Sequence, residues 1–299
     1  MALSTSAIEA PHTLRATIGD YIALMKPKII LLLLVTALGA MFLAAEGAPA
    51  GGTVALVLIG GSLASGGANA LNHYLDRDID QMMGRTRKRP LPGRRVEPLH
   101  AFIFGVTLNV IAFVMLAGGV NLLSAWLTLS ATLFYVFIYT RWLKRSTTQN
   151  IVIGGAAGAI PPLVGWAAVT GSLSLEAWYL FAIVFFWTPP HFWALALMIK
   201  DDYERAGVPM LPVVRGVSET AWSIFLHAVT LVTITILFVM MDTVGAVYGG
   251  AAIALGGVFL AMSLHLLRSL SLAHAKRLYL FSLLYLALLF LFVGLEGSV

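Results

Sequence analysis

Nine apolar segments, each of roughly 20 residues, constrain this chain more than any other feature of its sequence. Backbone N–H and C=O groups find no water in the hydrocarbon core of a bilayer, so segments of this length cross it as helices. A mean hydropathy of +0.89 and a charged fraction of 11% agree with a membrane protein and exclude an ordinary soluble domain. The sequence therefore predicts an all-α, polytopic membrane protein, a bundle of nine transmembrane helices. The nine segments are Ile29–Ala45, Val54–Ala70, Ala101–Ala117, Leu122–Tyr139, Ile151–Val169, Trp178–Ile199, Ala221–Met241, Val244–Leu267 and Leu278–Leu295.

The positive charges all fall on one side of these segments. If the N-terminus is cytosolic, all 19 lysines and arginines lie in the N-terminal tail or in cytosolic connections. The charged residues on the opposite side are then all acidic: Glu46, Glu176, Asp242 and Glu296. Because lysine and arginine stay on the cytosolic side in short loops, this distribution predicts a cytosolic N-terminus and a C-terminus on the opposite side. The formal charge of +5 describes a basic face next to anionic lipid and does not argue for nucleic-acid binding.

The chain ends and the cysteine count set two further limits. Residues 1–20 lack the pattern of a cleaved signal, and Pro11 to Asp20 is polar and typical of a loop. We expect residues 1–20 to be a cytosolic tail and residues 21–299 to be a single membrane domain. The chain has no cysteine, so any metal must be bound by oxygen or imidazole ligands.

The first long cytosolic connection contains a regular row of oxygen-bearing side chains. Asn72, Asp76 and Asp80 recur every fourth residue, so a helix that continued past the bilayer would place them on one face, about 6 Å apart per step. Magnesium prefers oxygen ligands and is often bound by one or two carboxylates together with substrate phosphates. The row therefore predicts a magnesium–diphosphate site, with free phosphate oxygens bound by nearby cations. Those cations are Arg85, Arg87, Lys88, Arg89 and Arg94.

A second interpretation of this connection is a solvated loop whose acids and bases pair for solubility while its cations set the topology. The four-residue spacing at a membrane boundary favours the functional interpretation, because carboxylates near lipid are costly. The next cytosolic connection adds Arg141, Lys144, Arg145 and Asn150. The three cations could equally be topology anchors, and Lys144 is our choice for a phosphate contact.

The connection after the sixth segment carries a second acidic group, Asp201, Asp202 and Glu204. Two acidic groups facing each other across one end of a bundle could hold magnesium ions around a diphosphate. His191 lies about two helical turns inside the membrane from this group, next to the helix break that Pro189-Pro190 predicts. A lone histidine in such a place is more often a hydrogen-bonded structural residue than a ligand.

Three stretches of the chain resemble the UbiA superfamily of membrane prenyltransferases. The first is the row from Asn72 to Asp80 followed by Arg85-Thr-Arg-Lys-Arg-Pro-Leu-Pro. The others are residues 150–163 and residues 202–213, which look like the haem-modifying branch of that superfamily. The chain departs from the general pattern before Gly207, where Tyr203 and Ile199 stand in place of two aspartates. Lys-Asp-Asp-Tyr at this point supports the haem-modifying branch and leaves open whether Asp201 or Asp202 binds metal.

The resemblance implies a reaction and a set of site residues. Farnesyl diphosphate would donate its farnesyl group to a vinyl side chain of haem B, with water added, to give haem O, and Mg²⁺ would be the cofactor. A haem A synthase is the protein partner that this reaction suggests, and we expect a bacterial inner (plasma) membrane location with the active site facing the cytoplasm. The expected catalytic residues are Asp76, Asp80, Asp202 and Lys144, and the expected metal ligands are Asp76, Asp80, Asp201 and Asp202. The expected substrate-binding residues are Asn72, Arg85, Arg89, Lys200, Tyr203, Arg205, His191 and Asn150.

Two alternatives remain open at the level of sequence. A superfamily member that prenylates a quinone precursor would share the diphosphate chemistry and differ only in its acceptor. A transporter would place ionisable groups near the middle of its spans, and none of the nine segments has an acid or base there. Four aromatic residues in the segments could line an apolar cavity, although ordinary packing is the likelier role for each; these are Trp166, Phe186, Trp187 and Trp193.

Overall fold

The computed structural model describes residues 14–297. Nine helices in this part of the chain are long and apolar enough to cross a membrane, and no strand occurs in it. This confirms the predicted all-α architecture and the nine predicted spans. The spans are α2 (Pro27–Ala45), α3 (Gly51–Leu75), α5 (Pro98–Gly119), α6 with η1 and α7 (Leu122–Ser146), α8 (Asn150–Thr170), α9 (Leu175–Met198), α12 with η2 (Gly216–Met240), α13 (Ala246–Ser269) and α14 (Leu272–Glu296).

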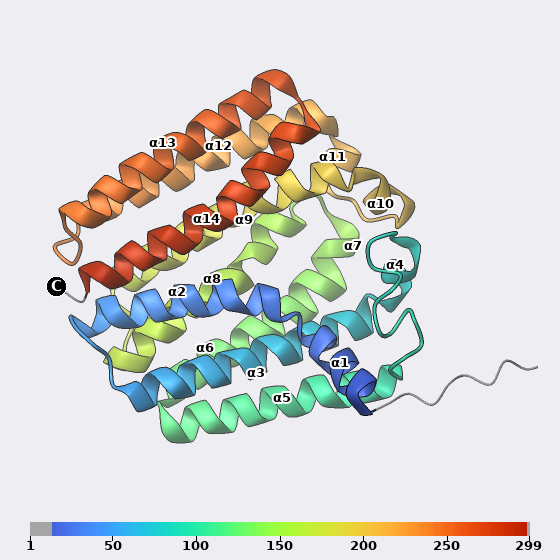
Figure 1. The fold of residues 1–299 in the computed structure, drawn as a ribbon, viewed down its shortest axis with the longest axis horizontal. Helices are drawn as coiled ribbons and strands as arrows, with labels where there is room; N and C mark the ends of the chain where they lie inside the picture. Colours follow the sequence, from blue (N-terminus) through green and yellow to red (C-terminus); the bar gives the residue numbers. More distant parts are fainter. Residues whose placement is uncertain (1–13, 298–299) are drawn as a thin grey trace, which may run out of the picture.

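Short helices lie in the connections at one end of the bundle. Figure 1 shows α4, α10 and α11 at the end opposite the C-terminus. The predicted cytosolic connections therefore gather at this end, which we call the acidic end because it carries Asp76, Asp80 and Asp202. The short helices are α1 (Leu14–Met25), α4 (Arg77–Met82), α7 (Lys144–Ser146), α10 (Lys200–Arg205) and α11 (Leu211–Val214).

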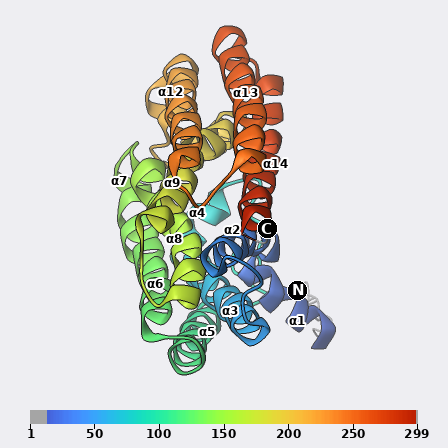
Figure 2. The same ribbon diagram turned by 90° about the vertical axis from the view of Figure 1, so that its left-hand side faces the viewer.

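The nine spans form a closed circuit of neighbours. Each packs against the next in the order α2, α3, α5, α6, α8, α9, α12, α13 and α14, and α14 returns to α2. Contacts of α2 with α8 and of α14 with α9 cross the middle of this circuit. Seen from the end in Figure 2, α4 lies near the middle of the bundle. Because Figure 1 places α4 at the end of the spans, the first acidic row lies at one mouth of this circuit.

Close helix approach depends on glycine at two positions of α8. A Cβ atom on Gly165 would lie 2.1 Å from the carbonyl oxygen of Ala37 in α2, and one on Gly154 would lie 2.3 Å from Cδ2 of Tyr139. Small residues let membrane helices pack backbone to backbone. The glycine-rich fifth span thus packs closely against both α2 and η1.

Two local expectations are wrong. Residues 14–20 form part of α1 rather than a loop, because α1 packs against α3, buries Leu24 and pairs Asp20 with Arg95 (2.8 Å). The expected break at Pro189-Pro190 does not occur, since α9 continues through both prolines. Neighbouring helices keep such a helix intact in a membrane, and here Thr188, Pro189 and Pro190 are all buried against them.

Candidate active site

The row of Asn72, Asp76 and Asp80 is buried at the acidic end. Helix α3 ends at Leu75 and α4 begins at Arg77, yet i to i+4 hydrogen bonds join the N–H of Asp76 to Asn72 and the N–H of Asp80 to Asp76. The three residues are 4%, 1% and 2% exposed, and the Asn72 amide donates to Oδ2 of Asp76 (2.8 Å). The predicted row therefore exists on one buried face, across a local break in the helix.

Three cations from separate elements meet this row. Lys144 Nζ donates to Asp76 Oδ2 (2.5 Å), and Arg89 donates to both carboxylate oxygens of Asp80 (2.9 Å each). Lys26 Nζ donates to Oδ1 of Asn72 (2.9 Å). Burying charged groups is costly unless they are paired, and sites of this kind are usually functional. The structure thus pairs Lys144 and Arg89 with the carboxylates and adds Lys26 to the row. The predicted contacts of Lys144 and Arg89 with phosphate stay a prediction.

Lys26 is a site residue that the sequence analysis missed. Its position just before the first apolar segment made it look like an ordinary topology anchor. In the structure it connects α1 to α2 with a left-handed backbone (φ 55°), which is rare for a residue with a side chain. Burial, together with the nearby charges of Arg89 and Lys144, lowers the pKa of Lys26 from 10.5 to about 7. The lysine can therefore gain a proton when an anion binds.

The fourth span changes to a π-helix as it approaches the site. The segment η1 (Phe134–Leu143) follows α6 and carries Tyr135, Tyr139 and Thr140. The Thr140 hydroxyl accepts a hydrogen bond from the Asn72 amide (3.1 Å), and the two tyrosine rings stack with their centroids 5.5 Å apart. Single-turn π segments often occur at functional sites, and this longer one holds Thr140 against the row. No residue pattern in the sequence predicted it.

The second acidic segment touches the first connection through Asp202. Its carboxylate accepts hydrogen bonds from the backbone N–H groups of Gly84 (3.3 Å) and Arg85 (3.4 Å), and it pairs with Arg205. Asp201 is exposed. The structure therefore brings Asp202, rather than Asp201, into contact with the first connection.

Other predicted binding residues in the described part of the chain make no hydrogen bond or ion pair with the row from Asn72 to Asp80. The side chain of Arg85 is exposed, while Lys200 and Tyr203 are half-buried in α10. Asn150 is fully buried, and neither polar atom of its amide has a hydrogen-bond partner. Because an unpaired buried amide costs free energy, Asn150 is a candidate for a contact with bound substrate or water.

His191 lies in the interface between α9 and α14. Its Nδ1 is 2.7 Å from the Ser282 hydroxyl, and its ring stacks between Trp187 (centroids 4.3 Å apart) and Tyr279 (4.8 Å). The structure therefore shows this histidine hydrogen-bonded and packed, and its predicted substrate contact stays a prediction.

The four aromatic candidates are mostly packed into the core. Trp166, Trp187 and Trp193 are buried, and Trp187 donates its indole N–H to the Ser282 carbonyl oxygen (2.7 Å). The indole N–H groups of Trp166 and Trp193 are buried without a partner. Phe186 is partly buried against the same core. A cavity-lining role for these residues stays a prediction.

The donor set at the row suits a hard divalent cation. Oδ1 of Asp76 is buried and accepts no hydrogen bond, with Arg145 3.7 Å away, so a buried carboxylate oxygen is available. Carboxylate oxygens are the ligands that Mg²⁺ prefers. In the described part of the chain no three acidic or histidine side chains form a ready metal cluster, so the four-aspartate ligand set stays a prediction.

These observations define a multi-pass helical membrane protein with a buried carboxylate–cation site at one end of its bundle. The sequence matches the UbiA prenyltransferase family over residues 33–292, and the chain belongs to that family, whose members transfer prenyl groups.

Relatives and solved structures agree with this assignment. The chain is 51% identical to the protoheme IX farnesyltransferase of Symbiobacterium thermophilum, covering 93% of this chain and 94% of the relative. It is 50% identical to the protein of the same name from Gloeobacter violaceus, with 95% and 93% covered. The fold resembles that of a digeranylgeranylglyceryl phosphate synthase (TM-score 0.78, 16% identity, 94% and 99% covered). It also resembles a UbiA homolog from Archaeoglobus fulgidus bound to DMAPP and Mg²⁺ (TM-score 0.67, 14% identity, 93% and 99% covered).

Proposed function

We propose that this protein transfers the farnesyl group of farnesyl diphosphate to a vinyl side chain of haem B, giving haem O. The observation that carries the proposal is a sequence identity of 51% and 50%, over nearly the whole chain, to two relatives named protoheme IX farnesyltransferase. The buried row of Asn72, Asp76 and Asp80 supports the donor half of this reaction, because it combines carboxylates with cations at one end of a membrane bundle.

The diphosphate is the part of the donor that this site suits. Lys26, Arg89 and Lys144 would bind phosphate oxygens that the metal leaves free. Magnesium held by Asp76, Asp80 and Asp202 would neutralise charge on the departing diphosphate. When the diphosphate binds, Lys144 and Arg89 would turn from the carboxylates to the phosphate, which leaves those carboxylates free for the cation. The Lys26 side chain would take up a proton at the same time, since its pKa is about 7 before binding.

The reaction requires the allylic C–O bond to break and the farnesyl carbon to bond to the haem vinyl group. A water oxygen would add to the other vinyl carbon and lose its proton, which gives a hydroxyethylfarnesyl side chain. The protein's part is to stabilise the leaving diphosphate with preorganised cations and to keep bulk water from the cation that forms. Burial of Asp76 and Asp80 suits such a water-poor site.

The location and the partner belong to the same proposal. All 19 lysines and arginines fall on one side of the nine spans, which supports a cytosolic acidic end in a bacterial inner membrane. A haem A synthase, which would consume haem O, is the expected partner.

Product analysis with two acceptors tests the proposal. Membranes containing the full chain are incubated with farnesyl diphosphate, Mg²⁺ and either haem B or an aromatic quinone precursor, and products are identified by mass. The proposal expects haem O only from haem B, and no product once magnesium is chelated. A prenylated aromatic product without haem O would show that the protein acts on a quinone precursor instead.

A further inference from the structure

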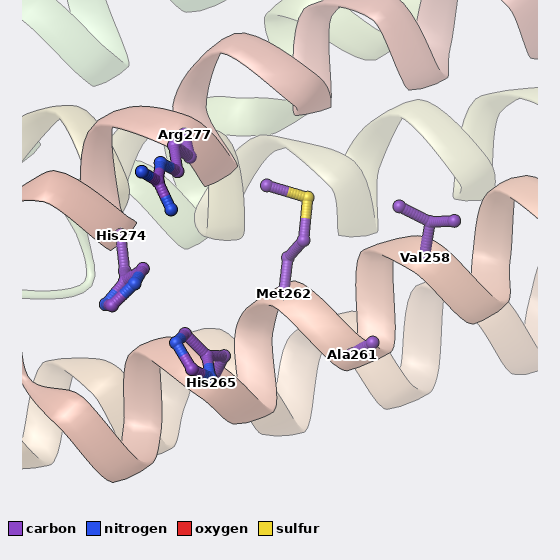
Figure 3. A pocket seen from close by; sticks show the side chains of 6 residues that line it. All are labelled: Val258, Ala261, Met262, His265, His274 and Arg277. Atoms are coloured by element: carbon purple, nitrogen blue, oxygen red, sulfur yellow. The ribbon is translucent and has the colours of Figure 1, made fainter.

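A pocket of about 360 Å³ lies between α13 and α14, at the acidic end of the bundle. Figure 3 shows Met262 and His265 on α13 and His274 and Arg277 on α14, lying toward one another. Ala261, next to Met262, and Val258, one turn before Met262 on α13, complete the lining. None of these residues belongs to the carboxylate–cation site described above.

The pocket has a polar half and an apolar half. His265, His274 and Arg277 lie near the turn that joins the two helices, and the rings of the two histidines meet edge to face with centroids 4.1 Å apart. Val258, Ala261 and Met262 lie further toward the middle of the span. A ligand that fills both halves needs a polar group at the end of the bundle and an apolar group along the helices.

The polar half is positively charged and rich in donors. No acidic residue occurs in the sequence between Asp242 and Glu296, and both of these lie at the opposite end of the hairpin. The neighbouring helix α12 offers Glu219, which is 3.9 Å from Arg215, the residue just before that helix. Among the described residues, Arg277 therefore has no carboxylate partner.

A hydroxyl group contacts one ring nitrogen of His274. Ser269 Oγ lies 2.8 Å from Nδ1 of His274 and accepts a hydrogen bond from the N–H of Ser271 (3.4 Å). In the tautomer whose Nδ1 accepts from the Ser269 hydroxyl, a neutral His274 carries its proton on Nε2. His274 then joins Arg277 as a hydrogen-bond donor, and the pair suits an oxyanion.

The apolar half continues onto the outer surface of the bundle. Val258 is 47% exposed, the exposed Ala254 lies one turn before it on α13, and the exposed Leu280 and Leu284 follow on α14. A hydrocarbon chain that leaves the pocket would remain against apolar side chains. A free inorganic anion would use only the polar half.

We propose that this pocket binds the phosphate headgroup of an anionic phospholipid, whose acyl chain lies against Met262 and Val258. Basic pockets between helices at the cytosolic membrane surface suit anionic headgroups, because the phosphate meets fixed cations where the hydrocarbon begins. Arg277 provides the charge-assisted hydrogen bonds, and His274 provides a neutral one.

Native mass spectrometry of the purified full chain in detergent tests this site with three probes. These are dioleoyl phosphatidylglycerol, dioleoyl phosphatidylcholine and inorganic phosphate. We expect one tightly bound phosphatidylglycerol per chain, about tenfold weaker binding of phosphatidylcholine, and no displacement of the bound lipid by an equal concentration of phosphate. Equal binding of the two lipids, or displacement by phosphate, would overturn the proposal.

Variants of adjacent residues separate the pocket from general charge attraction. Arg277→Gln should weaken phosphatidylglycerol binding by about tenfold or more, whereas Lys276→Gln, which removes the same charge outside the lining, should change it less than about twofold. Ala261→Trp fills the pocket without changing charge and should also abolish the bound lipid. Thermal unfolding of each variant checks that it is folded. If Arg277→Gln does not fold, His274→Gln takes its place in the comparison. Equal losses in Lys276→Gln and Arg277→Gln, or unchanged binding in Ala261→Trp, would contradict a specific site.

Discussion

Two buried carboxylates, Asp76 and Asp80, face three cationic side chains, Lys26, Arg89 and Lys144. With Lys26 protonated, these five groups carry one net positive charge. Such a group of buried charges is costly to fold, and its arrangement is explained if an anion and a metal enter it during function. The cations then have a use that their pairing with aspartate alone does not provide.

Lys26 predicts a pH dependence of substrate binding. Its pKa is about 7 in the free protein, and a bound diphosphate would raise it. Below pH 7 the lysine is already protonated, so this group leaves the affinity unchanged; above pH 7 binding must take up a proton, so affinity falls by up to about tenfold per pH unit. Calorimetric titration with a non-reactive thio analogue of farnesyl diphosphate between pH 6 and 9, values chosen to span that pKa, measures this dependence.

Lys26→Arg is the matched control for this dependence, because arginine stays protonated over the same range. The variant should bind the analogue with a flatter profile above pH 7. Identical profiles for the two proteins would show that another group is responsible.

Single residues were predictable where their spacing encodes their placement. Asn72, Asp76 and Asp80 share a face because helical i to i+4 geometry continues through the break at Asp76. Lys26 reaches the row only because its own backbone turns left-handed between α1 and α2, and no local pattern announces that turn. Lys144 was chosen for its place in a basic connection, and its contact with Asp76 comes from the packing of η1 on α3.

Helix α8 shows how backbone approach holds the elements together. It contacts α2 across the middle of the circuit and η1 beside the site, and glycine occurs at both approaches. Tyr139, which lies on the same π-helix as Thr140, packs over Gly154 of α8. The position of η1 thus depends on glycine, which has no side chain, at position 154 of α8.

Gly165→Ala should destabilise the bundle. The new Cβ would lie 2.1 Å from the Ala37 carbonyl oxygen, so α2 and α8 must separate. Overpacking of this kind costs about 1–3 kcal/mol, which should appear as a lower midpoint and a lower free energy of unfolding in detergent.

Gly158→Ala provides the control within the same helix. A Cβ at Gly158 meets nothing within 4 Å, and alanine favours a helix over glycine by roughly 0.5–1 kcal/mol. This variant should be as stable as the parent protein or slightly more stable. If the two variants unfold alike, close approach at Gly165 does not limit stability.

Elements were predictable in proportion to their apolar length. All nine spans follow from runs without charge, because a bilayer leaves no other structure open to them. Helix α1 escaped prediction because its stability comes from Leu24 and from the pair of Asp20 with Arg95, which only tertiary packing brings together. The prolines of α9 led to the opposite error, a predicted break that does not occur, because packing supports a helix that they would break in isolation.

The whole molecule has its chemistry at one end. The alternation of nine spans places the C-terminal ends of α3, α7, α9 and α13 together, and Figure 1 shows the connecting helices α4 and α10 there, opposite the C-terminus. A donor whose diphosphate is charged and whose tail is apolar fits such a site, because the charged part meets the connections and the tail meets the spans.

Cysteine labelling tests the proposed orientation, and the cysteine-free chain needs no prior mutation. Arg87→Cys lies in the connection after α4, and Ala48→Cys lies between α2 and α3, with both native residues exposed. A membrane-impermeant maleimide should label Ala48→Cys in right-side-out vesicles and Arg87→Cys in inverted ones. The reverse pattern would place the acidic end outside the cell.

The central claim is that the buried row activates farnesyl diphosphate for transfer to haem B. Its most direct test compares haem O formation by the parent chain, Asp76→Asn and Asp78→Asn in membranes. Asp78 is the right control because its side chain is 58% exposed and pairs with Arg145, whereas that of Asp76 is 1% exposed. The account predicts haem O from the parent, a loss of about 100-fold or more in Asp76→Asn, and most of the activity retained in Asp78→Asn. Parent-level haem O formation by correctly inserted Asp76→Asn would contradict it.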